Sequence, residues 1–334
     1  MKPAVNMAKD MGRIAFWYPF RWLAQMLPLR AAPWVGKVLG FGDWALSGHA
    51  RISRMKRNIR NALGQTAPVG KILLANLQSH GMNMVEFMKY PQMDAPASQK
   101  LVTWQNREAL DDALGKGKGV ILLTAHFGAK QFLQLAMGYA GYAVNQINYH
   151  LTDEYLSWVQ KHVAQKQRMR IESSIPCHYI SAKGFLRDTF RCLQANELLI
   201  IAADGIGQKQ LMDASFLPFP FMGKTMFFPA NYVSLARRTG ATLLPCFILR
   251  EGHRHRIVFH SPVVGEGEDA VRQYVSLLEQ YVRRYPCFWE FWEELEEGQL
   301  LASRPQDPPP GSPSAPGTRE NVCRQNPEAQ CQVH

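Results

Sequence analysis

From about residue 115 onward, short apolar runs alternate with helix-forming segments, and this alternation constrains the fold more than any other feature. The stretch "GKGKGVILLTAHFG" is a glycine-rich turn followed by an apolar run and a glycine, and "AKQFLQLAMGYAG" after it has helical spacing. Further strand-like runs occur in "GYAVNQINYH", "ELLIIAADG" and "ATLLPCFILR", with helical segments between them. The pattern predicts an α/β fold with a central, mostly parallel sheet flanked by helices.

The segments on either side of this region extend the prediction. Before it, "RISRMKRNIRNALG" and "GKILLANLQSHGMNMVEFMKYP" have helical spacing until Pro91, so we expect the first third to be helical. After it, "RHRIVFHSPV" reads as a strand that pairs antiparallel with the preceding one, and residues 266–285 as a last helix.

The N-terminal segment is basic and apolar together. Residues 1–60 hold eleven Lys and Arg but only two Asp and Glu, in a chain of net charge +11, which favours a polyanionic neighbour. Bulky apolar residues lie between these charges in "IAFWYPFRWLAQMLPLRAAPW", while Pro19, Arg21 and Pro28 interrupt any run long enough to span a bilayer. We expect amphipathic helices that lie on an anionic membrane surface; the alternative is amphipathic helices packed on the core. No nucleic-acid partner is expected, because no single-strand-binding fold is indicated.

These observations divide the chain into three parts. Residues 1–60 are predicted to be a basic amphipathic membrane-associating segment, residues 61–298 an α/β domain, and residues 299–334 a disordered Pro-rich tail. The first residues lack the apolar core and cleavage site of a secretory signal, so we expect the protein at the cytoplasmic face of the inner membrane. The six cysteines have no C-x-x-C spacing, so neither a zinc site nor a disulfide framework is predicted.

Two titratable residues close apolar strands. His126 follows "VILLTA" and Asp204 follows "LLIIAA", so in a parallel sheet both emerge at the same edge. An imidazole there is suited to remove a proton from a hydroxyl, and Gly128 would let a substrate approach the backbone. The alternative is a histidine that only hydrogen-bonds a backbone carbonyl at the strand end.

The motif around His126 resembles a known one. "AHFGAKQF" is similar to the "HFGNWE" form found in the late lipid A biosynthesis acyltransferases, within the lysophospholipid acyltransferase superfamily. The resemblance extends to "RNIRNALG", "LQANELLIIAADG", "FLPFPFMGKTMFFPANYVSLARRTGATLLPCFILR" and "RRYPCFWEFWEEL", and covers about residues 15–295.

The resemblance implies a glycerolipid-acyltransferase-like fold and a membrane-associated transferase of lipid biosynthesis. Such an enzyme moves a fatty acyl group from an acyl thioester, on acyl carrier protein or coenzyme A, to a hydroxyl of a lipid acceptor. His126 would be the general base, and the resemblance implies neither a metal nor another cofactor, nor a covalent enzyme intermediate.

The chain departs from the family pattern at the acidic residue of the motif, where it has Gln131. An amide can orient an imidazole but supplies no negative charge. Three explanations remain open: a slower enzyme with Gln131 as the orienting group, an enzyme in which Asp204 or another acid substitutes, or a catalytically silent lipid-binding homologue. His150 and the acidic ending "FWEFWEELEEG" also differ from the family, which favours an acceptor other than a lipid A precursor.

Further candidates each have a structural alternative. Gly223 and Lys224 lie in a loop that borders the cleft in this family, so Lys224 is either a phosphate contact or a solvated loop lysine. Arg187 shares a helical face with Lys183 and Arg191, which either binds phosphate or acyl carrier protein or is solvated. The apolar run of residues 216–228 suits an acyl-chain channel, a membrane-dipping loop or plain core packing. The histidines at 253, 255 and 260 lack the partners of a metal site.

Overall fold

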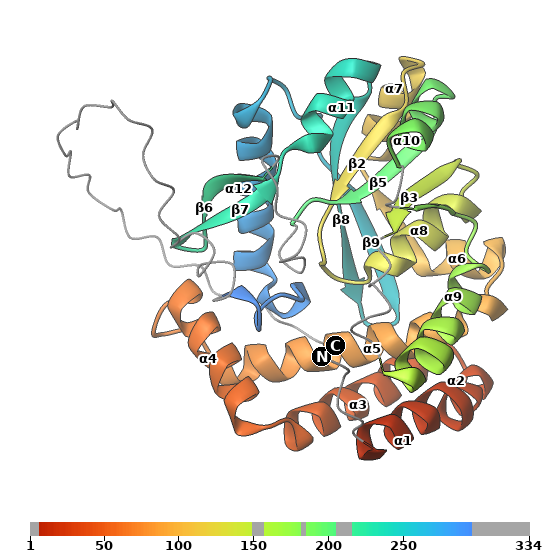
Figure 1. The fold of residues 1–334 in the computed structure, drawn as a ribbon, viewed down its shortest axis with the longest axis vertical. Helices are drawn as coiled ribbons and strands as arrows, with labels where there is room; N and C mark the ends of the chain where they lie inside the picture. The colour runs from red at the N-terminus through yellow and green to blue at the C-terminus, as the bar shows by residue number, and fades with distance from the viewer. Residues whose placement is uncertain (1–6, 149–156, 182–184, 205–215, 296–334) are drawn as a thin grey trace.

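The computed structural model describes residues 7–148, 157–181, 185–204 and 216–295, and its main sheet has seven strands. The spatial order is β1-β9-β8-β2-β5-β3-β4, and every neighbouring pair is parallel except β8 with β9. Figure 1 shows this sheet with helices on both faces. The strands are β1 (Val102–Gln105), β2 (Val120–Thr124), β3 (Val144–Asn148), β4 (His178–Ser181), β5 (Leu198–Ala202), β8 (Thr242–Glu251) and β9 (Arg254–Phe259).

The central strand β2 is buried on both faces, as expected for a parallel strand covered by helices. Ile121 and Leu123 face one core and Val120 and Leu122 the other, because successive side chains of a strand point to opposite faces. The first core is shared with α10 (Phe185–Gln194), α11 (Asn231–Thr239) and α12 (Glu268–Arg284). The second is shared with α7 (Arg107–Gly115), α8 (Lys130–Tyr139) and α9 (Lys166–Glu172).

The prediction of a mostly parallel sheet flanked by helices is confirmed, and so is the antiparallel pairing of the two strands around residue 252. The remaining helical turns are short: η2 (Tyr90–Gln92), α6 (Ala95–Leu101), the π-helical η4 (Gln160–Gln165) and η5 (Pro286–Phe288). β1 and β4 were not recognised in the sequence because each has only four residues.

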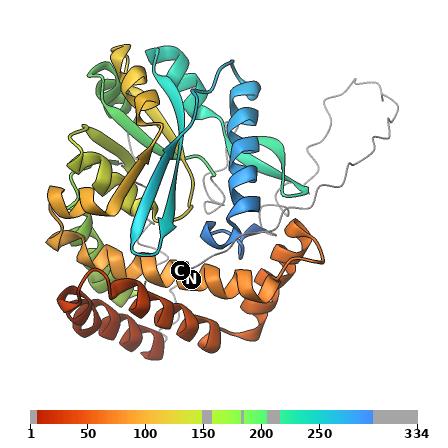
Figure 2. The same ribbon diagram turned by 180° about the vertical axis from the view of Figure 1, so that it is seen from behind.

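The N-terminal helices form a layer at one end of the sheet, as two opposite views show (Figures 1 and 2). The layer consists of α1 (Met7–Ala15), the π-helical η1 (Phe16–Phe20), α2 (Arg21–Met26), α3 (Ala32–Leu46), α4 (His49–Leu63) and α5 (Val69–Lys89). Asn83 of α5 donates a hydrogen bond to the Gly128 carbonyl in the loop after β2, at 2.7 Å. The layer therefore covers the carboxyl end of β2.

Helices α3 and α5 approach closely because glycines lie at their crossing. A Cβ atom added to Gly36 would lie 2.3 Å from the Met82 Cα, and one added to Gly40 would lie 2.3 Å from the Gln78 Cα. Gly81 of α5 faces the Gly36 carbonyl in the same way. The glycines thus allow backbone-to-backbone packing that any larger residue would prevent.

Replacing Gly36 by Ala is therefore expected to destabilise the protein by about 1–3 kcal/mol, because the helices have to move apart. Gly42→Ala is the matched control: it lies in the same helix with nothing within 4 Å of its added Cβ, so it should be neutral or stabilising by up to about 1 kcal/mol. Urea unfolding followed by circular dichroism measures both. Equal effects of the two changes would contradict the close packing.

Lys89 joins α2 to the end of α5. Its ammonium group is buried and donates to the carbonyls of Ala24, Gln25 and Leu27 at 3.0, 3.1 and 2.6 Å. These carbonyls belong to the C-terminal turn of α2, which leaves its last acceptors without helical partners. Burial lowers the Lys89 pKa, while the contacts with the negative end of the α2 dipole stabilise its charged form.

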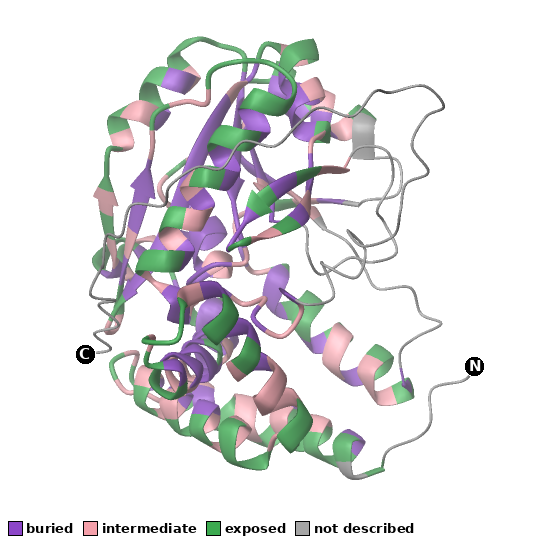
Figure 3. Cartoon of the chain, turned by 90° about the vertical axis from the view of Figure 1, so that its left-hand side faces the viewer, coloured by how far each residue is buried: buried purple, intermediate pink, exposed green. Residues whose placement is uncertain are grey.

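Many large apolar side chains of this layer are exposed to solvent. Figure 3 colours many positions on the outer side of the layer as exposed. Trp34, Val38 and Leu46 of α3 are 71%, 70% and 89% exposed. The other members lie on α1 to α3 as well: Met7, Met11, Ile14, Tyr18, Trp22, Leu23, Met26, Phe41 and Trp44. We call these twelve residues the apolar face. Within the described residues, no helix is both long and apolar enough to cross a bilayer.

The predicted domain boundaries can be compared with the helices of the structure. The boundary after residue 60 falls inside α4, which continues to Leu63. Arg51 and Arg54 of α4 also pair with Glu293, so α4 is attached to the C-terminal segment. The predicted tail at 299–334 lies outside the described residues.

The apolar run of residues 216–228 forms a two-stranded hairpin of β6 (Phe216–Phe221) and β7 (Lys224–Pro229). Pro218 and Pro220 both lie on its exposed side, where a strand tolerates proline. Five of its large side chains belong to the buried core, namely Phe219, Phe221, Met222, Met226 and Phe228. These five side chains are therefore packed in the core and are not exposed as those of a membrane-dipping loop would be.

Candidate functional site

His126 and Asp204 meet at the carboxyl ends of two neighbouring strands. β2 and β5 pair in register with Thr124 opposite Ala202, so both residues lie two positions beyond the paired strands. The imidazole Nδ1 lies 2.7 Å from Asp204 Oδ1, and the His126 backbone N–H donates to Asp204 Oδ2 at 2.7 Å. Both oxygens of the fully buried Asp204 carboxylate thus contact the same residue.

This contact determines how the imidazole is oriented. An ionised carboxylate only accepts hydrogen bonds, so the neutral imidazole that fits this contact is the tautomer with the proton on Nδ1 and the lone pair on Nε2. The His126 side chain is 29% exposed, and so its ring is accessible rather than enclosed by the core. The ring also lies beside that of Phe291, with 4.5 Å between centroids. The partner of His126 Nδ1 is thus the Asp204 carboxylate. The alternative drawn from the sequence, a histidine bonded only to a backbone carbonyl at the strand end, does not describe this contact.

The loop that carries His126 is fixed by the C-terminal segment. Phe127 forms an antiparallel bridge with Trp289, the Gly128 N–H donates to the Phe288 carbonyl at 2.8 Å, and the Glu290 N–H donates to the His126 carbonyl at 2.9 Å. Asn76 of α5 donates in turn to the Trp289 carbonyl at 2.7 Å. Backbone hydrogen bonds on both sides therefore hold the loop.

Gly128 has φ +59°, a conformation that favours glycine, and a Cβ added to it would lie 2.0 Å from the Ile248 carbonyl oxygen. On the side where a Cβ would lie, the backbone of strand β8 packs against Gly128. The approach of a substrate to the Gly128 backbone stays a prediction.

Gly128→Ala should therefore cost more than about 2 kcal/mol of stability, because strain and a backbone clash combine. Gly141→Ala is the control, since Gly141 has φ +91° and open space around it. It should cost about 1 kcal/mol from conformational strain alone. Urea unfolding of both variants tests this, and a Gly128→Ala protein as stable as the control would exclude the clash.

Lys130 and Glu290 form an ion pair next to His126 that sequence reasoning missed. Lys130 Nζ lies 2.8 Å from Glu290 Oε2, and the two side chains are 19% and 22% exposed. Burial alone would raise the Glu290 pKa, but the charges of Lys130, His126 and His80 outweigh it and lower this pKa to about 2. Two glutamates of the acidic ending therefore form ion pairs with basic side chains. Glu290 pairs with Lys130, and Glu293 pairs with Arg51 and Arg54.

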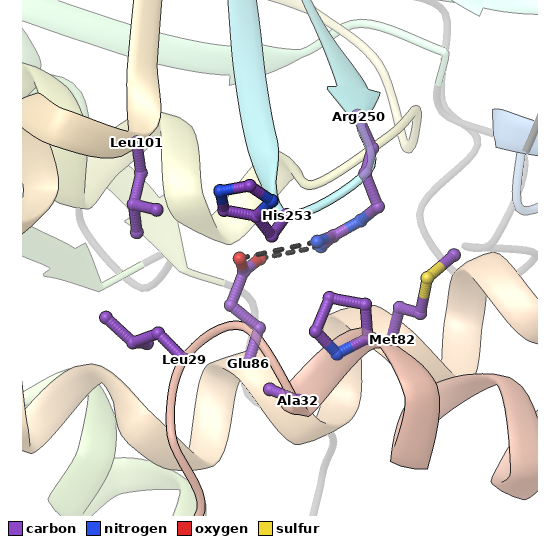
Figure 4. A pocket seen from close by; sticks show the side chains of 8 residues that line it. Leu29, Ala32, Met82, Glu86, Leu101, Arg250 and His253 are labelled. Carbon is purple, nitrogen blue, oxygen red and sulfur yellow. Dashed lines mark hydrogen bonds and ion pairs between the residues drawn. The ribbon is translucent and has the colours of Figure 1, made fainter. Parts of the chain in front are cut away.

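A second buried polar cluster lies between α5 and the β8–β9 hairpin (Figure 4). Glu86 pairs with Arg250 NH2 at 2.6 Å and with His255 Nε2 at 2.7 Å, and Arg250 also donates to Asn83 Oδ1 at 2.8 Å. Burial would raise the Glu86 pKa, but Arg250 and His255 lower it to about 2. The adjoining pocket, lined by Glu86, Arg250, His253 and apolar side chains, has about 10 Å³, room for about one water molecule.

Asn83 connects this cluster to the loop that carries His126. Asn83 accepts from Arg250 and donates to the Gly128 carbonyl. His255 Nε2 contacts Glu86 Oε1 at 2.7 Å, and His260 Nε2 contacts the Tyr281 hydroxyl at 2.7 Å. Among the described residues, no group of His, Cys, Asp and Glu could hold a metal ion.

The structure describes four of the remaining predicted residues, namely Gln131, Arg187, Gly223 and Lys224. Gln131 lies half-buried in the first turn of α8, and within the part of the chain that the structure describes it makes no hydrogen bond to His126. Gly223 lies in the β6–β7 turn and Lys224 is the first residue of β7, paired with Phe221, whose ring lies 5.5 Å from that of Trp289. Arg187 is exposed on α10, which follows the outermost strand β4. His150 and Lys183 lie outside the described residues.

The site thus combines a partly exposed histidine with a buried carboxylate at the carboxyl edge of an α/β sheet, the groups that general-base chemistry requires. The comparison with known families agrees. The model of a family described as bacterial lipid A biosynthesis acyltransferase matches residues 8–292, most of the chain, and the chain belongs to this family. The predicted resemblance and fold class are thereby confirmed. No curated protein matches the chain.

Proposed function

We propose that this protein transfers a fatty acyl group from an acyl thioester, carried by acyl carrier protein or coenzyme A, to a hydroxyl group of a lipid acceptor. Membership of an acyltransferase family supports acyl transfer in general. The observation that carries the specific proposal is the 2.7 Å contact between His126 Nδ1 and the buried Asp204 carboxylate.

In the proposed reaction, the Nε2 lone pair of His126 takes the proton of the acceptor hydroxyl while the acceptor oxygen attacks the thioester carbonyl carbon. The new C–O bond forms, the C–S bond breaks, and the imidazolium returns the proton to the departing sulfur, so the products are an ester and a thiol. Asp204 holds the ring and stabilises the imidazolium charge as it forms.

We further propose that the apolar face rests on the cytoplasmic leaflet of the inner membrane. The exposed aromatic residues of this face suit the interfacial zone of a bilayer. The basic charges of the same segment, among them the exposed Arg30, favour anionic lipid. Sedimentation with vesicles tests this: wild type should bind those with anionic lipid more strongly, and Trp34→Ser with Val38→Ser should weaken binding to all vesicles.

The second candidate function is a catalytically silent lipid-binding homologue, and Gln131 is the observation that favours it. The Asp204 contact weighs against it, because a silent protein has no need of a buried carboxylate that orients an accessible imidazole. Purified protein incubated with labelled acyl carrier protein or acyl-coenzyme A and total membrane lipid separates the two candidates.

Wild type is expected to give a labelled lipid, and His126→Ala is expected to lose at least about 10²-fold of that rate. Thermal unfolding of both proteins verifies that the variant is folded. Equal labelling by wild type and His126→Ala, with both folded, would leave the silent homologue as the better description.

A further inference from the structure

The Lys130–Glu290 ion pair forms a wall beside the imidazole that the proposed proton transfer does not use. Glu290 is bound through its backbone N–H to the His126 carbonyl, at 2.9 Å, and Lys130 begins the helix that follows the His126 loop. Both side chains are partly open to solvent, as His126 is. A head group whose hydroxyl reaches His126 therefore has this ion pair as an immediate neighbour.

The wall itself consists of one positive and one negative charge. The buried Asp204 carboxylate, which contacts His126 Nδ1, places a second carboxylate next to the ring. Glu290 remains ionised at neutral pH, since its pKa is lowered to about 2, and the charge of Lys130 is already engaged by Glu290 Oε2.

Hydrogen-bonding chemistry then distinguishes two kinds of head group. A hydroxyl group can donate to a carboxylate and accept from an ammonium group, so a sugar or polyol fits both members of the pair. A phosphate monoester offers acceptor oxygens and negative charge, so Glu290 repels it at close range and it has to compete for Lys130.

On the basis of the proposed acyl transfer, we infer that the acceptor presents an uncharged, hydroxyl-rich head group to the Lys130–Glu290 wall and that Glu290 discriminates against phosphorylated head groups. Glu290 is in this sense a specificity-determining residue of the acceptor site.

The test compares two acceptors in mixed micelles, a glycolipid with an unmodified sugar and the same lipid with a phosphate monoester on the neighbouring carbon. Wild type should use the unmodified lipid with at least about tenfold higher kcat/KM, which corresponds to about 1.4 kcal/mol. Glu290→Gln should reduce that preference at least fivefold, mainly through a lower KM for the phosphorylated lipid. Glu293→Gln is the control, because Glu293 pairs with Arg51 and Arg54 on the same C-terminal segment, and it should keep the preference.

A wild-type preference for the phosphorylated lipid would overturn the inference, and so would an equal change of both rates in Glu290→Gln. A binding measurement separates this outcome from failure of the proposed function. The methyl glycoside of the sugar and its phosphate ester are titrated into wild type and Glu290→Gln and followed by NMR.

Wild type should bind the glycoside, and the phosphate ester should gain at least fivefold in affinity with Glu290→Gln. If both binding results are obtained but neither lipid is acylated, the proposed acyl transfer is rejected, while the inference that Glu290 disfavours phosphorylated head groups stands. Unchanged relative binding of the two head groups would reject the selectivity, whatever the transfer rates.

Discussion

Asp204→Asn is expected to lower kcat for acyl transfer by about 10³ to 10⁴-fold while the fold remains intact, the scale seen when a buried triad carboxylate becomes an amide. Asparagine has nearly the same shape as aspartate, and its oxygen can still accept the His126 backbone N–H. Its NH₂ group facing Nδ1 would favour the tautomer with the proton on Nε2, which removes the lone pair that acts as the base. Steady-state kinetics with labelled acyl donor measure the loss, and thermal unfolding checks the fold.

Gln131→Ala provides the comparison for this result, because Gln131 was the other candidate for orienting the imidazole. We expect this variant to stay within about tenfold of wild type, since Asp204 already contacts both His126 Nδ1 and the His126 backbone N–H. The reverse ranking, with Gln131→Ala inactive and Asp204→Asn active, would assign the orienting role to Gln131.

Glu86→Gln is expected to destabilise the protein by about 3–5 kcal/mol, because it leaves Arg250 buried without its charged partner. The Arg250 and Glu86 side chains are only 3% and 8% exposed. Glu279→Gln is the matched control, since Glu279 pairs with Arg283 at the surface and should cost no more than about 1 kcal/mol. Urea unfolding at neutral pH measures both variants.

The same cluster predicts a pH dependence of stability. The Glu86 pKa is lowered from 4.5 to about 2 in the folded protein, so its ionised form stabilises the fold above about pH 4.5. That contribution is lost as the pH falls from about 4.5 towards 2. The free energy of unfolding should therefore fall less steeply over this window in Glu86→Gln than in wild type, and identical slopes would show that Glu86 does not titrate there.

Glu86→Leu combined with Arg250→Met should recover part of the stability that either single change removes, because neither a carboxylate nor a guanidinium is left buried without its partner. Burial lowers the His255 pKa, which favours a neutral imidazole once Glu86 is absent. If the two losses simply add, the pairing of these side chains contributes nothing to stability.

The sequence predicted those parts of the molecule that depend on local pattern. The apolar runs ending at His126 and Asp204 identified two parallel strands, and adjacency of β2 and β5 brought those residues together, as the edge argument predicted. The β6–β7 hairpin was missed because Pro218 and Pro220 are signals against strands. Lys130 and Glu290 were missed because they lie 160 residues apart and no periodic pattern links them.

Polar side chains on one side of helix α5 contact three separate segments of the chain. Asn76 contacts the C-terminal segment, Asn83 the loop after β2, and Glu86 the β8–β9 hairpin. One residue inserted between Leu77 and Met82 would turn the later part of the helix by about 100° relative to the earlier part. Asn83 and Glu86 would then lose their partners together, so α5 should tolerate exchanges on its exposed side far better than any change in its length.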